Sequence, residues 1–353
     1  MALTLKECRE RLDALGRVSL GFYPTKLHRL ERLSRELGVD LWIKREDLSG
    51  VSLFGGNKVR KLQYLMKDAI EQGCDTVFTY GATQSNHVMQ TATAARLCGL
   101  RPVLYLGAIV EPKPGDARAN FLLDKILGAE IHVLPSLGRS TRETMEANRP
   151  LFDEHIRRLA AEGHKVYDIP VGGSTPRGAA GFAECFVELM EQSAALALKP
   201  DYLCLATGSG GTLAGLAAGR AMTGASDVSI RGYTVGRKDP GSYPAGIARL
   251  ASDVLALLGL PEKKVQPGDF TVRFDFFKPG YEHPSPAANA DIRLLARTEG
   301  IFTDPVYTGK GFHGMLEDIR SGAIPKGSTV VFLHTGGATA LFSEPEILGD
   351  LAD

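Results

Sequence analysis

Apolar residues along this chain occur in short continuous runs that alternate with helical stripes. The run DLWIKRED, residues 40–47, is typical of a strand. The next segment places apolar residues at the i, i+3, i+4 and i+7 spacing of one helix face, at Leu62, Leu65, Met66 and Ala69. Gly73 follows, where a glycine commonly ends a helix.

The same alternation continues along most of the chain. Further strands are predicted at residues 75–82, 102–108, 130–135, 165–173, 201–208, 228–236 and 328–337. Helices are predicted at residues 84–99, 119–129, 142–162, 178–193 and 212–223. Strands that alternate with helices predict an α/β protein with parallel sheets, helices on both faces, and ligands at the carboxyl ends of the strands.

Length and composition narrow the class of protein. A chain of 353 residues suits two α/β lobes. Lys and Arg together number 41, as do Asp and Glu, so neither a nucleic acid nor an anionic membrane is an expected partner. The five cysteines are scattered without a Cys-x-x-Cys pair, which predicts reduced thiols and no metal site. The N-terminus lacks the apolar core of a signal peptide and no apolar run reaches membrane-spanning length, so we expect a cytoplasmic protein.

A glycine-rich turn between a predicted strand and helix is one candidate site. In LATGSGGTLAG, residues 205–215, bare backbone N–H groups and a helix N-terminus converge, a geometry that holds phosphate. Leu213 stands where a dinucleotide fingerprint needs glycine, and no Gly-Lys-Ser/Thr of a P-loop follows. The alternative is a tight turn without a ligand. The candidate phosphate-binding residues are Gly208, Ser209, Gly210, Gly211 and Thr212.

A second candidate site follows the strand at residues 75–82. Gln84, Ser85, Asn86 and His87 lie where this strand ends and a helix begins. Any one of them could simply cap the helix. Four consecutive polar residues favour a cup for a substrate carboxylate.

A lysine completes the set. Lys58 follows Gly55, Gly56 and Asn57 at a predicted helix start, and Lys61 lies one turn later, where it could reach the same anion. Near the C-terminus, Tyr307 and Thr308 precede another glycine-rich helix start, and Thr335 ends a strand. A lysine, a phosphate cup, a carboxylate cup and tyrosines fit pyridoxal 5'-phosphate, whose aldehyde a lysine amine captures as an imine.

Several motifs in order resemble one enzyme family. They are FGGNKVRKLQYL, GATQSNH, PVGGS, TGSGGTLAGL, LLARTEGIFTDPVYTGK and HTGGATALF. The chain is similar to the fold-type-II (tryptophan synthase β-like) pyridoxal phosphate enzymes, in the branch of D-cysteine desulfhydrase and 1-aminocyclopropane-1-carboxylate (ACC) deaminase. The resemblance implies two doubly wound parallel-sheet domains and a homodimer. Residues 1–58 and 166–353 would form the large cofactor domain, with residues 59–165 inserted as the small one.

The resemblance also implies roles for individual residues. Lys58 would carry the cofactor, with Ser85 and Asn86 at the substrate and the ring oxygen. Tyr281 and Tyr307 would flank the reacting carbon. We further expect Asn57, Lys61, Thr308 and Thr335 at the cofactor, and Gln84, His87 and Arg177 at the substrate, which is a small amino acid.

The expected reaction depends on two short motifs. The deaminase pattern in this branch is Tyr-Glu-Gly-Lys and His-Leu-Gly-Gly, whereas this chain has Thr308 and Thr335 at the second positions, as in the desulfhydrases. A carboxylate beside the pyridine nitrogen makes a stronger electron sink, which opening a cyclopropane needs. A neutral hydroxyl suffices when a good leaving group sits on the β-carbon. We therefore expect a carbon–sulfur lyase that performs α,β-elimination on a sulfur-substituted alanine, giving pyruvate, ammonia and sulfide.

Three alternatives stay open at this point. Arg177, with His283 or Arg237, could pair with a sulfonate, which would make the protein an L-cysteate sulfo-lyase that releases sulfite. These residues could equally be exposed and neutral to function. ACC deaminase is the less favoured activity. A nucleotide-binding oxidoreductase or a secreted binding protein would need a dinucleotide fingerprint or a signal peptide, and would leave Lys58 unexplained.

Overall fold

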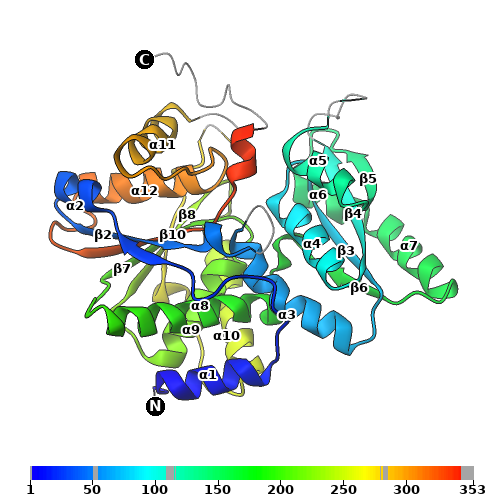
Figure 1. Cartoon of the computed structure of the whole chain (residues 1–353), viewed down its shortest axis with the longest axis horizontal. Coiled ribbons are helices and arrows are strands. Elements are labelled where there is room, and N and C mark those ends of the chain that lie inside the picture. The colour runs from blue at the N-terminus through cyan, green and yellow to red at the C-terminus, as the bar shows by residue number, and fades with distance from the viewer. Residues whose placement is uncertain are drawn as a thin grey trace.

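The computed structural model describes residues 2–50, 55–108, 115, 117–278, 280 and 285–342. Two lobes lie side by side, each built around its own parallel sheet (Figure 1). This confirms the expected α/β class with two parallel-sheet units.

The large lobe contains a six-stranded sheet in the order β1-β2-β10-β7-β8-β9. All its neighbouring strands are parallel except β1, which pairs antiparallel with β2. Central strands covered on both faces read as continuous apolar runs, which is why they were predictable. The bounds are β1 Leu27–Arg29, β2 Asp40–Arg45, β7 Tyr202–Thr207, β8 Ser229–Thr234, β9 Thr271–Arg273 and β10 Thr329–His334.

Helices cover both faces of this sheet (Figure 1). One face carries α1 Leu5–Ala14, α8 Pro176–Ala195, α9 Gly211–Thr223 and α10 Ser242–Leu257; the other carries α2 Glu31–Leu37, α11 Pro286–Glu299 and α12 Thr308–Arg320. Gly215 lets α9 approach α8 closely, since a Cβ atom there would lie 2.1 Å from the Ala179 carbonyl oxygen. Short 3₁₀ turns are η1 Glu46–Leu48, η2 Val171–Gly173, η3 Pro267–Asp269 and η4 Ala338–Phe342.

The small lobe contains a four-stranded, all-parallel sheet in the order β5-β4-β3-β6. Its strands are β3 Thr76–Ala82, β4 Arg101–Ala108, β5 Glu130–Pro135 and β6 Val166–Ile169. The helices α4 Asn86–Leu97 and α5 Ala119–Ile126 pack on one face, and α6 Thr141–Ala147 and α7 Arg149–Ala161 lie on the other. The helix α3, Asn57–Glu71, contacts both α8 and α4 and therefore joins the lobes.

Three details differ from the sequence-based expectations. The single helix expected at residues 142–162 is two helices that meet at Asn148, with Pro150 in the first turn of α7. The strand β6 pairs with β3, so the small sheet extends past residue 165 and a boundary between the lobes would fall after Ile169. The strands β1 and β9 have three residues each and were not predicted.

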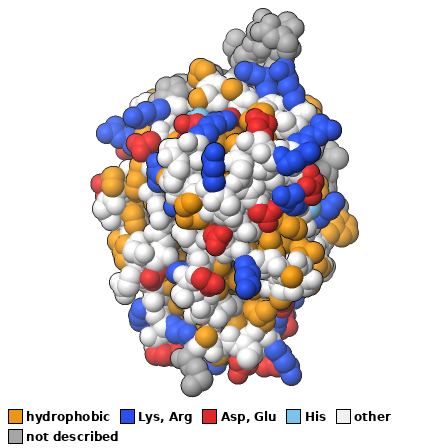
Figure 2. Space-filling model, turned by 90° about the vertical axis from the view of Figure 1, so that its left-hand side faces the viewer, with side chains coloured by type: hydrophobic (Ala, Val, Ile, Leu, Met, Phe, Trp, Pro, Cys, Tyr) orange, Lys and Arg blue, Asp and Glu red, His pale blue; other side chains and the backbone are white. Residues whose placement is uncertain are grey.

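The surface agrees with the balanced composition. On the face shown in Figure 2, basic and acidic side chains are interspersed among hydrophobic ones. Within the described residues, no helix combines the length and the apolar character that a bilayer crossing requires.

Candidate active site

Most of the predicted site residues that the structure describes lie near the carboxyl ends of parallel strands, where α/β sheets bind ligands. The start of α3 lies against the end of β10: the Asn57 N–H donates to the Thr335 carbonyl at 3.0 Å, and Gly56 forms a β-bridge with Gly336. The position of Lys58 therefore depends on contacts between the start of α3 and residues that follow β10, near the C-terminus.

Gly56 has a backbone conformation and a close contact that a side chain would strain. Its φ is 148°, and a Cβ atom there would lie 2.7 Å from Gln90 Nε2. This amide nitrogen donates to the Gly55 carbonyl at 3.0 Å. Gln90, on α4, thus ties the small lobe to the turn before Lys58. Sequence reasoning missed it, because its partner Gly55 is 35 residues away along the chain.

The Lys58 amine has the environment of a nucleophile. Its Nζ donates to Asn57 Oδ1 at 2.8 Å, while Asn57 Nδ2 donates to Thr212 Oγ1 at 2.9 Å, linking the lysine to the glycine-rich turn. Burial disfavours the ammonium form and lowers the pKa of Lys58 to about 8. A large fraction of this amine is therefore neutral just above neutral pH.

This shift predicts the pH dependence of cofactor capture. Only the neutral amine attacks an aldehyde, so the rate at which pyridoxal phosphate attaches to cofactor-free protein should rise about tenfold per pH unit below pH 8 and level off above it. An unperturbed lysine would keep rising toward its ordinary pKa near 10.5. Stopped-flow absorbance between pH 6 and 10 measures the difference, and a rate still rising tenfold per unit above pH 9 would contradict the assignment.

The glycine-rich turn after β7 meets a second lysine. The Lys61 side chain is buried and donates to the Gly172 carbonyl at 3.0 Å. A Cβ atom on Gly211 would lie 2.7 Å from Lys61 Nζ and 2.6 Å from Ser174 Oγ. Burial, and then the charge of Lys58, hold the pKa of Lys61 well below its usual value. A buried lysine beside the bare N-terminus of α9 is chemically suited to an anion such as phosphate.

Other polar groups complete this turn. Ser174 Oγ donates to Ser209 Oγ at 2.8 Å. Tyr243, which sequence reasoning missed, donates from its hydroxyl to the Gly208 carbonyl at 3.0 Å and lies 2.8 Å from Thr207 Oγ1. It is separated from Gly208 by 35 residues, so no local pattern could reveal the contact.

The turn after β3 was expected to bind the substrate carboxylate, and several of its side chains instead bond to other parts of the protein. Ser85 caps α4 by accepting the Val88 N–H at 3.3 Å. Gln84 serves the start of α5, since its Nε2 donates to the Arg118 carbonyl at 3.2 Å and its Oε1 accepts the Asn120 N–H at 3.1 Å. The Gln84 amide, which was expected to bind substrate, therefore bonds to the start of α5 in this structure.

Asn86 also has protein partners. Its Oδ1 accepts from Asn120 Nδ2 at 2.8 Å and from Thr339 Oγ1 at 2.9 Å, so Asn86 links α4 to α5 and to the segment after β10. These contacts fix the orientation of its amide group.

His87 lies near both lysines. It is buried with Nε2 at 2.8 Å from Thr79 Oγ1, and a Cβ atom on Gly173 would lie 3.6 Å from its Cε1. Burial, followed by the charges of Lys58 and Lys61, holds the pKa of His87 well below its usual value. A neutral imidazole can donate or accept a hydrogen bond there, but it cannot attract a carboxylate by charge.

The start of α12 contains a carboxylate that was not predicted. The buried Thr308 hydroxyl donates to Asp304 Oδ1 at 2.6 Å and accepts the Asp304 N–H at 3.0 Å. Asp304 also accepts the backbone N–H groups of Val306, Tyr307 and Thr308. Burial raises the pKa of Asp304, against the opposing effect of these bonds. The Gly336 carbonyl oxygen, at 3.4 Å, is a second and more distant acceptor for this hydroxyl, so its proton points to protein oxygens and a further group would meet its lone pair.

Two tyrosines, Tyr307 and Tyr281, were also expected at the site. Tyr307 lies beside the glycine-rich turn, since a Cβ atom on Gly208 would be 4.0 Å from its Cε1. Tyr281, like His283, falls outside the residues that the structure describes.

Arg177 is not part of this cluster. Its Nε lies 3.3 Å from Asp68 Oδ1, and its NH1 donates to the Leu15 carbonyl at 3.4 Å. Asp68 is ten residues beyond Lys58 on α3, which corresponds to about 15 Å along the helix axis. In the structure this guanidinium fastens α8 to the far end of α3, and the expectation that Arg177 binds substrate stays a prediction.

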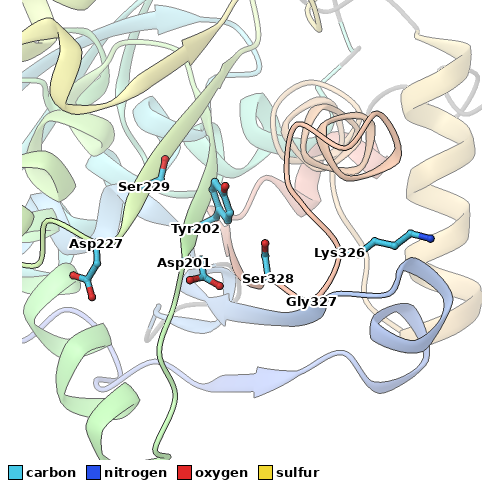
Figure 3. Close-up of a pocket in the computed structure, with 7 residues that line it drawn as sticks. All are labelled: Asp201, Tyr202, Asp227, Ser229, Lys326, Gly327 and Ser328. Carbon is cyan, nitrogen blue, oxygen red and sulfur yellow. The ribbon is translucent and has the colours of Figure 1, made fainter.

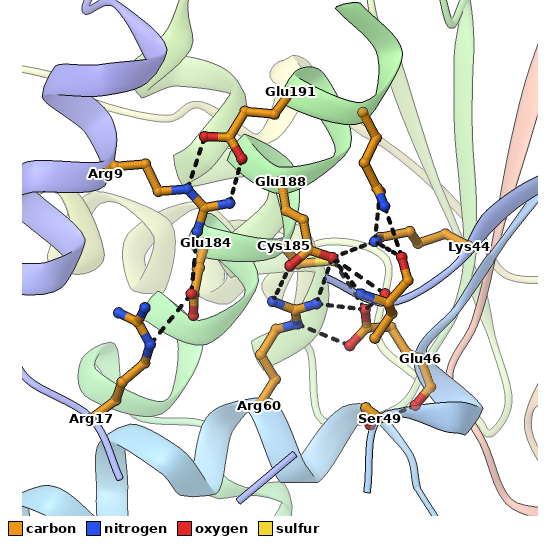
Figure 4. A network of polar contacts seen from close by, with 12 residues as sticks. Arg9, Arg17, Lys44, Glu46, Ser49, Arg60, Glu184, Cys185, Glu188 and Glu191 are labelled. Atoms are coloured by element: carbon orange, nitrogen blue, oxygen red, sulfur yellow. Dashed lines mark hydrogen bonds and ion pairs between the residues drawn. The ribbon is translucent and has the colours of Figure 1, made fainter. Parts of the chain in front are cut away.

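A buried ion network fixes the helix that carries Lys58 (Figure 4). Arg60, on α3, donates to Glu46 at 2.9 and 2.8 Å and to Glu188 at 3.1 Å from two nitrogens. Lys44 contacts Glu188 and donates to the Thr25 carbonyl at 2.7 Å. Two cations face two carboxylates, so the buried charges balance and connect β2, η1, α3 and α8.

A depression of about 420 Å³ lies elsewhere on the large lobe (Figure 3). It is lined by Asp201, Tyr202, Asp227, Ser229, Lys326, Gly327 and Ser328. Tyr202 and Ser229 are the first residues of β7 and β8, so the depression is at the amino ends of the strands. It lies on the opposite edge from Lys58 and is not the candidate site.

Comparison with known proteins decides the family. The family "Pyridoxal-phosphate dependent enzyme" matches residues 18–336. The chain belongs to this family. It is 37% identical over 339 residues to a D-cysteine desulfhydrase of Yersinia enterocolitica, a match that covers 94% of this chain and 95% of the relative. Among pyridoxal-phosphate enzymes it therefore falls in the branch of D-cysteine desulfhydrase and ACC deaminase.

Solved structures of pyridoxal-phosphate enzymes agree. A crystal structure described as an ACC deaminase homologue superposes with a TM-score of 0.83 at 35% identity, covering 96% of this chain and 98% of the other. A threonine deaminase from Solanum lycopersicum has a TM-score of 0.64 at 17% identity, covering 100% and 90%, and supports the fold alone. The family implies pyridoxal phosphate as cofactor. A partly neutral Lys58, and the bare backbone of Gly211 in close contact with Lys61, fit its aldehyde and phosphate.

Proposed function

We propose that this pyridoxal-phosphate enzyme is a carbon–sulfur lyase that converts a sulfur-substituted alanine, with cysteine as the leading substrate, into pyruvate, ammonia and sulfide. The supporting observation is the group that we place at the pyridine nitrogen: Thr308, whose proton goes to Asp304 at 2.6 Å. Relatives at 36–37% identity over nearly the whole chain include D-cysteine desulfhydrases and a putative ACC deaminase, so they support the branch and leave the substrate to the panel below.

The roles that we propose are those that the resemblance implies. Lys58 holds the cofactor and, once displaced by the substrate amine, removes the α-proton; Ser85 is the alternative base. Lys61 and residues 208–212 bind the phosphate, with Asn57 orienting Lys58. The bound cofactor withdraws electrons from the α-carbon, which is the chemistry that an elimination needs.

The substrate-facing residues are fewer than the sequence suggested. Ser85 and Asn86 present polar groups at the start of α4, and neutral His87 lies behind them. Backbone N–H groups at the N-terminus of α4 supply the positive potential for the substrate carboxylate. As the resemblance implies, we propose that Tyr307 lies near the reacting carbon and Thr335 near the cofactor ring.

The pair Thr308 and Asp304 supports elimination over cyclopropane opening. A neutral Thr308 oxygen stabilises a protonated ring nitrogen less than would the acid that the deaminase pattern places at this position, because that acid carries a full negative charge. Asp304 orients the hydroxyl without replacing that charge, because the threonine lies between them. The cysteate alternative relied on Arg177, with His283 or Arg237, and the ion pair of Arg177 with Asp68 does not favour it.

A substrate panel tests this proposal. D- and L-cysteine, D- and L-cysteate, β-chloroalanine and ACC are supplied to purified holoenzyme, and sulfide, sulfite, pyruvate and 2-oxobutyrate are measured separately. We expect sulfide and pyruvate in equal amounts from one cysteine enantiomer. Sulfite as the main product would favour cysteate, and 2-oxobutyrate from ACC would reject the argument from Thr308.

The assembly and location are further proposals. We propose a cytoplasmic homodimer, as the resemblance implies. Light scattering of the purified protein and cell fractionation test these two points.

A further inference from the structure

Two histidines and a glutamate converge on the outer side of the small lobe. Glu130 and His132 are two residues apart on β5, so their side chains leave the same face of the strand. His155 approaches from α7. One ligand atom from each residue lies within 4.8 Å of the others. His132 Nε2 is 2.8 Å, and His155 Nε2 is 3.5 Å, from Glu130 Oε1.

Neighbouring groups fix both imidazole rings. The Tyr105 ring stacks on His132 with centroids 4.6 Å apart and an interplanar angle of 16°. The Tyr105 hydroxyl is 2.7 Å from His155 Nδ1, which leaves Nε2 facing Glu130. Metal-binding histidines typically use their second ring nitrogen in this way, for a hydrogen bond that fixes the tautomer. Because these imidazole rings are already held in place, they lose less conformational freedom when an ion binds.

The spacing suits a small transition-metal ion. Tetrahedral zinc with bonds of about 2.0–2.1 Å places its ligand atoms about 3.3 Å apart. The two distances to Glu130 Oε1, 2.8 and 3.5 Å, are close to this spacing. Imidazole and carboxylate ligands are typical of zinc, and His132 is 37% exposed, which leaves access for water as a fourth ligand.

We propose that Glu130, His132 and His155 form a binding site for a divalent transition-metal ion of the zinc type, separate from the Lys58 site. The composition predicted no metal site, because a search for cysteine spacings cannot find one made of histidines from β5 and α7. Arg101 contacts Glu130 through the other carboxylate oxygen, Oε2. This cation orients the carboxylate and also weakens binding, so removing it should tighten the site.

A second cluster provides the comparison. Asp291, His313 and Glu317 also lie within reach of one ion, but only one imidazole is present. Arg320 already donates to both oxygens of Asp291, at 2.7 and 3.1 Å. This cluster therefore forms a complete ion-pair network without a metal.

Isothermal titration of chelator-treated, cofactor-loaded full-length protein with zinc chloride tests the site. We expect one tight site, weakened at least about tenfold in His132→Ala and in Glu130→Gln. Arg101→Gln should bind more tightly. His164→Ala, which removes an exposed histidine 3.0 Å from Asp75, and His313→Ala should bind as the parent does.

Cobalt(II) substitution adds a spectroscopic test, since tetrahedral cobalt absorbs intensely in the visible and octahedral cobalt weakly. The parent should give the tetrahedral spectrum and His132→Ala should lose it. His132 is half-exposed, so this variant should fold. Equal zinc affinity in the parent and His132→Ala, or a loss confined to His313→Ala, would overturn the proposal.

Discussion

Lys58→Ala is expected to lose the visible absorbance of bound pyridoxal phosphate and to lower turnover by about three orders of magnitude or more, because no other amine occupies the same position. Borohydride reduction should fix the cofactor to the parent protein and not to the variant. Peptide mapping of the reduced parent should place the label on Lys58. The measurement separates the attachment of the cofactor from every later step.

The matched control is Lys67→Ala on the same helix. Lys67 pairs with Glu71 at 3.0 Å and its side chain is 34% exposed, so its removal should leave both colour and activity intact. If Lys58→Ala retained colour and turnover, both the site and the proposed function would fail. If it lost colour while the parent eliminated no sulfur compound, only the proposed substrate class would fail.

Arg60→Met is expected to lower the free energy of unfolding by about 3–5 kcal/mol, because it leaves Glu46 and Glu188 buried with one cation fewer. Urea denaturation of the cofactor-free protein measures this. The control Lys6→Ala removes an exposed pair with Glu10 at 3.9 Å and should change stability by less than about 1 kcal/mol. Equal effects of the two substitutions would show that the network in Figure 4 contributes no more than a surface pair.

The same network predicts sensitivity to acid. Burial opposes ionisation of Glu188, but Arg60 and Lys44 outweigh it and lower its pKa to about 2. A lowered folded-state pKa contributes stability above the ordinary value near 4.5, and that contribution is lost as the pH falls toward 2. Arg60→Met should therefore narrow the difference in stability between pH 6 and pH 3.

The parts of the fold that were predictable are those with a local signal. The buried strands β3, β4, β7 and β10 are apolar runs, and the stripe from Leu62 to Ala69 on α3 is buried as its period predicted. The three-residue strands β1 and β9 are too short to show a period. The helix break at Asn148 had a visible signal, Pro150, that fits the first turn of a new helix.

The residues of the candidate site were likewise predictable only where a local sequence pattern marks them. Lys58 and the glycine-rich turn could be found because glycines mark where a backbone must stay bare. The contacts of Arg177 with Asp68 and Leu15 depend on how α1, α3 and α8 pack, which no local pattern contains. Asp304 could have been recognised, since Asp-Pro commonly starts a turn in which the Asp carboxylate accepts the backbone N–H two residues on, here that of Val306.

The bond from Gln90 to the Gly55 carbonyl has a consequence for motion. Gln90 and Ser85 belong to the same short helix segment of the small lobe, so a rotation of that lobe moves both together. Any displacement that brings Ser85 toward an amino acid also pulls on the two residues that precede Asn57. We expect substrate docking and the release of Lys58 to be coupled, because the hydrogen bond from the Gln90 amide to Gly55 links the two movements.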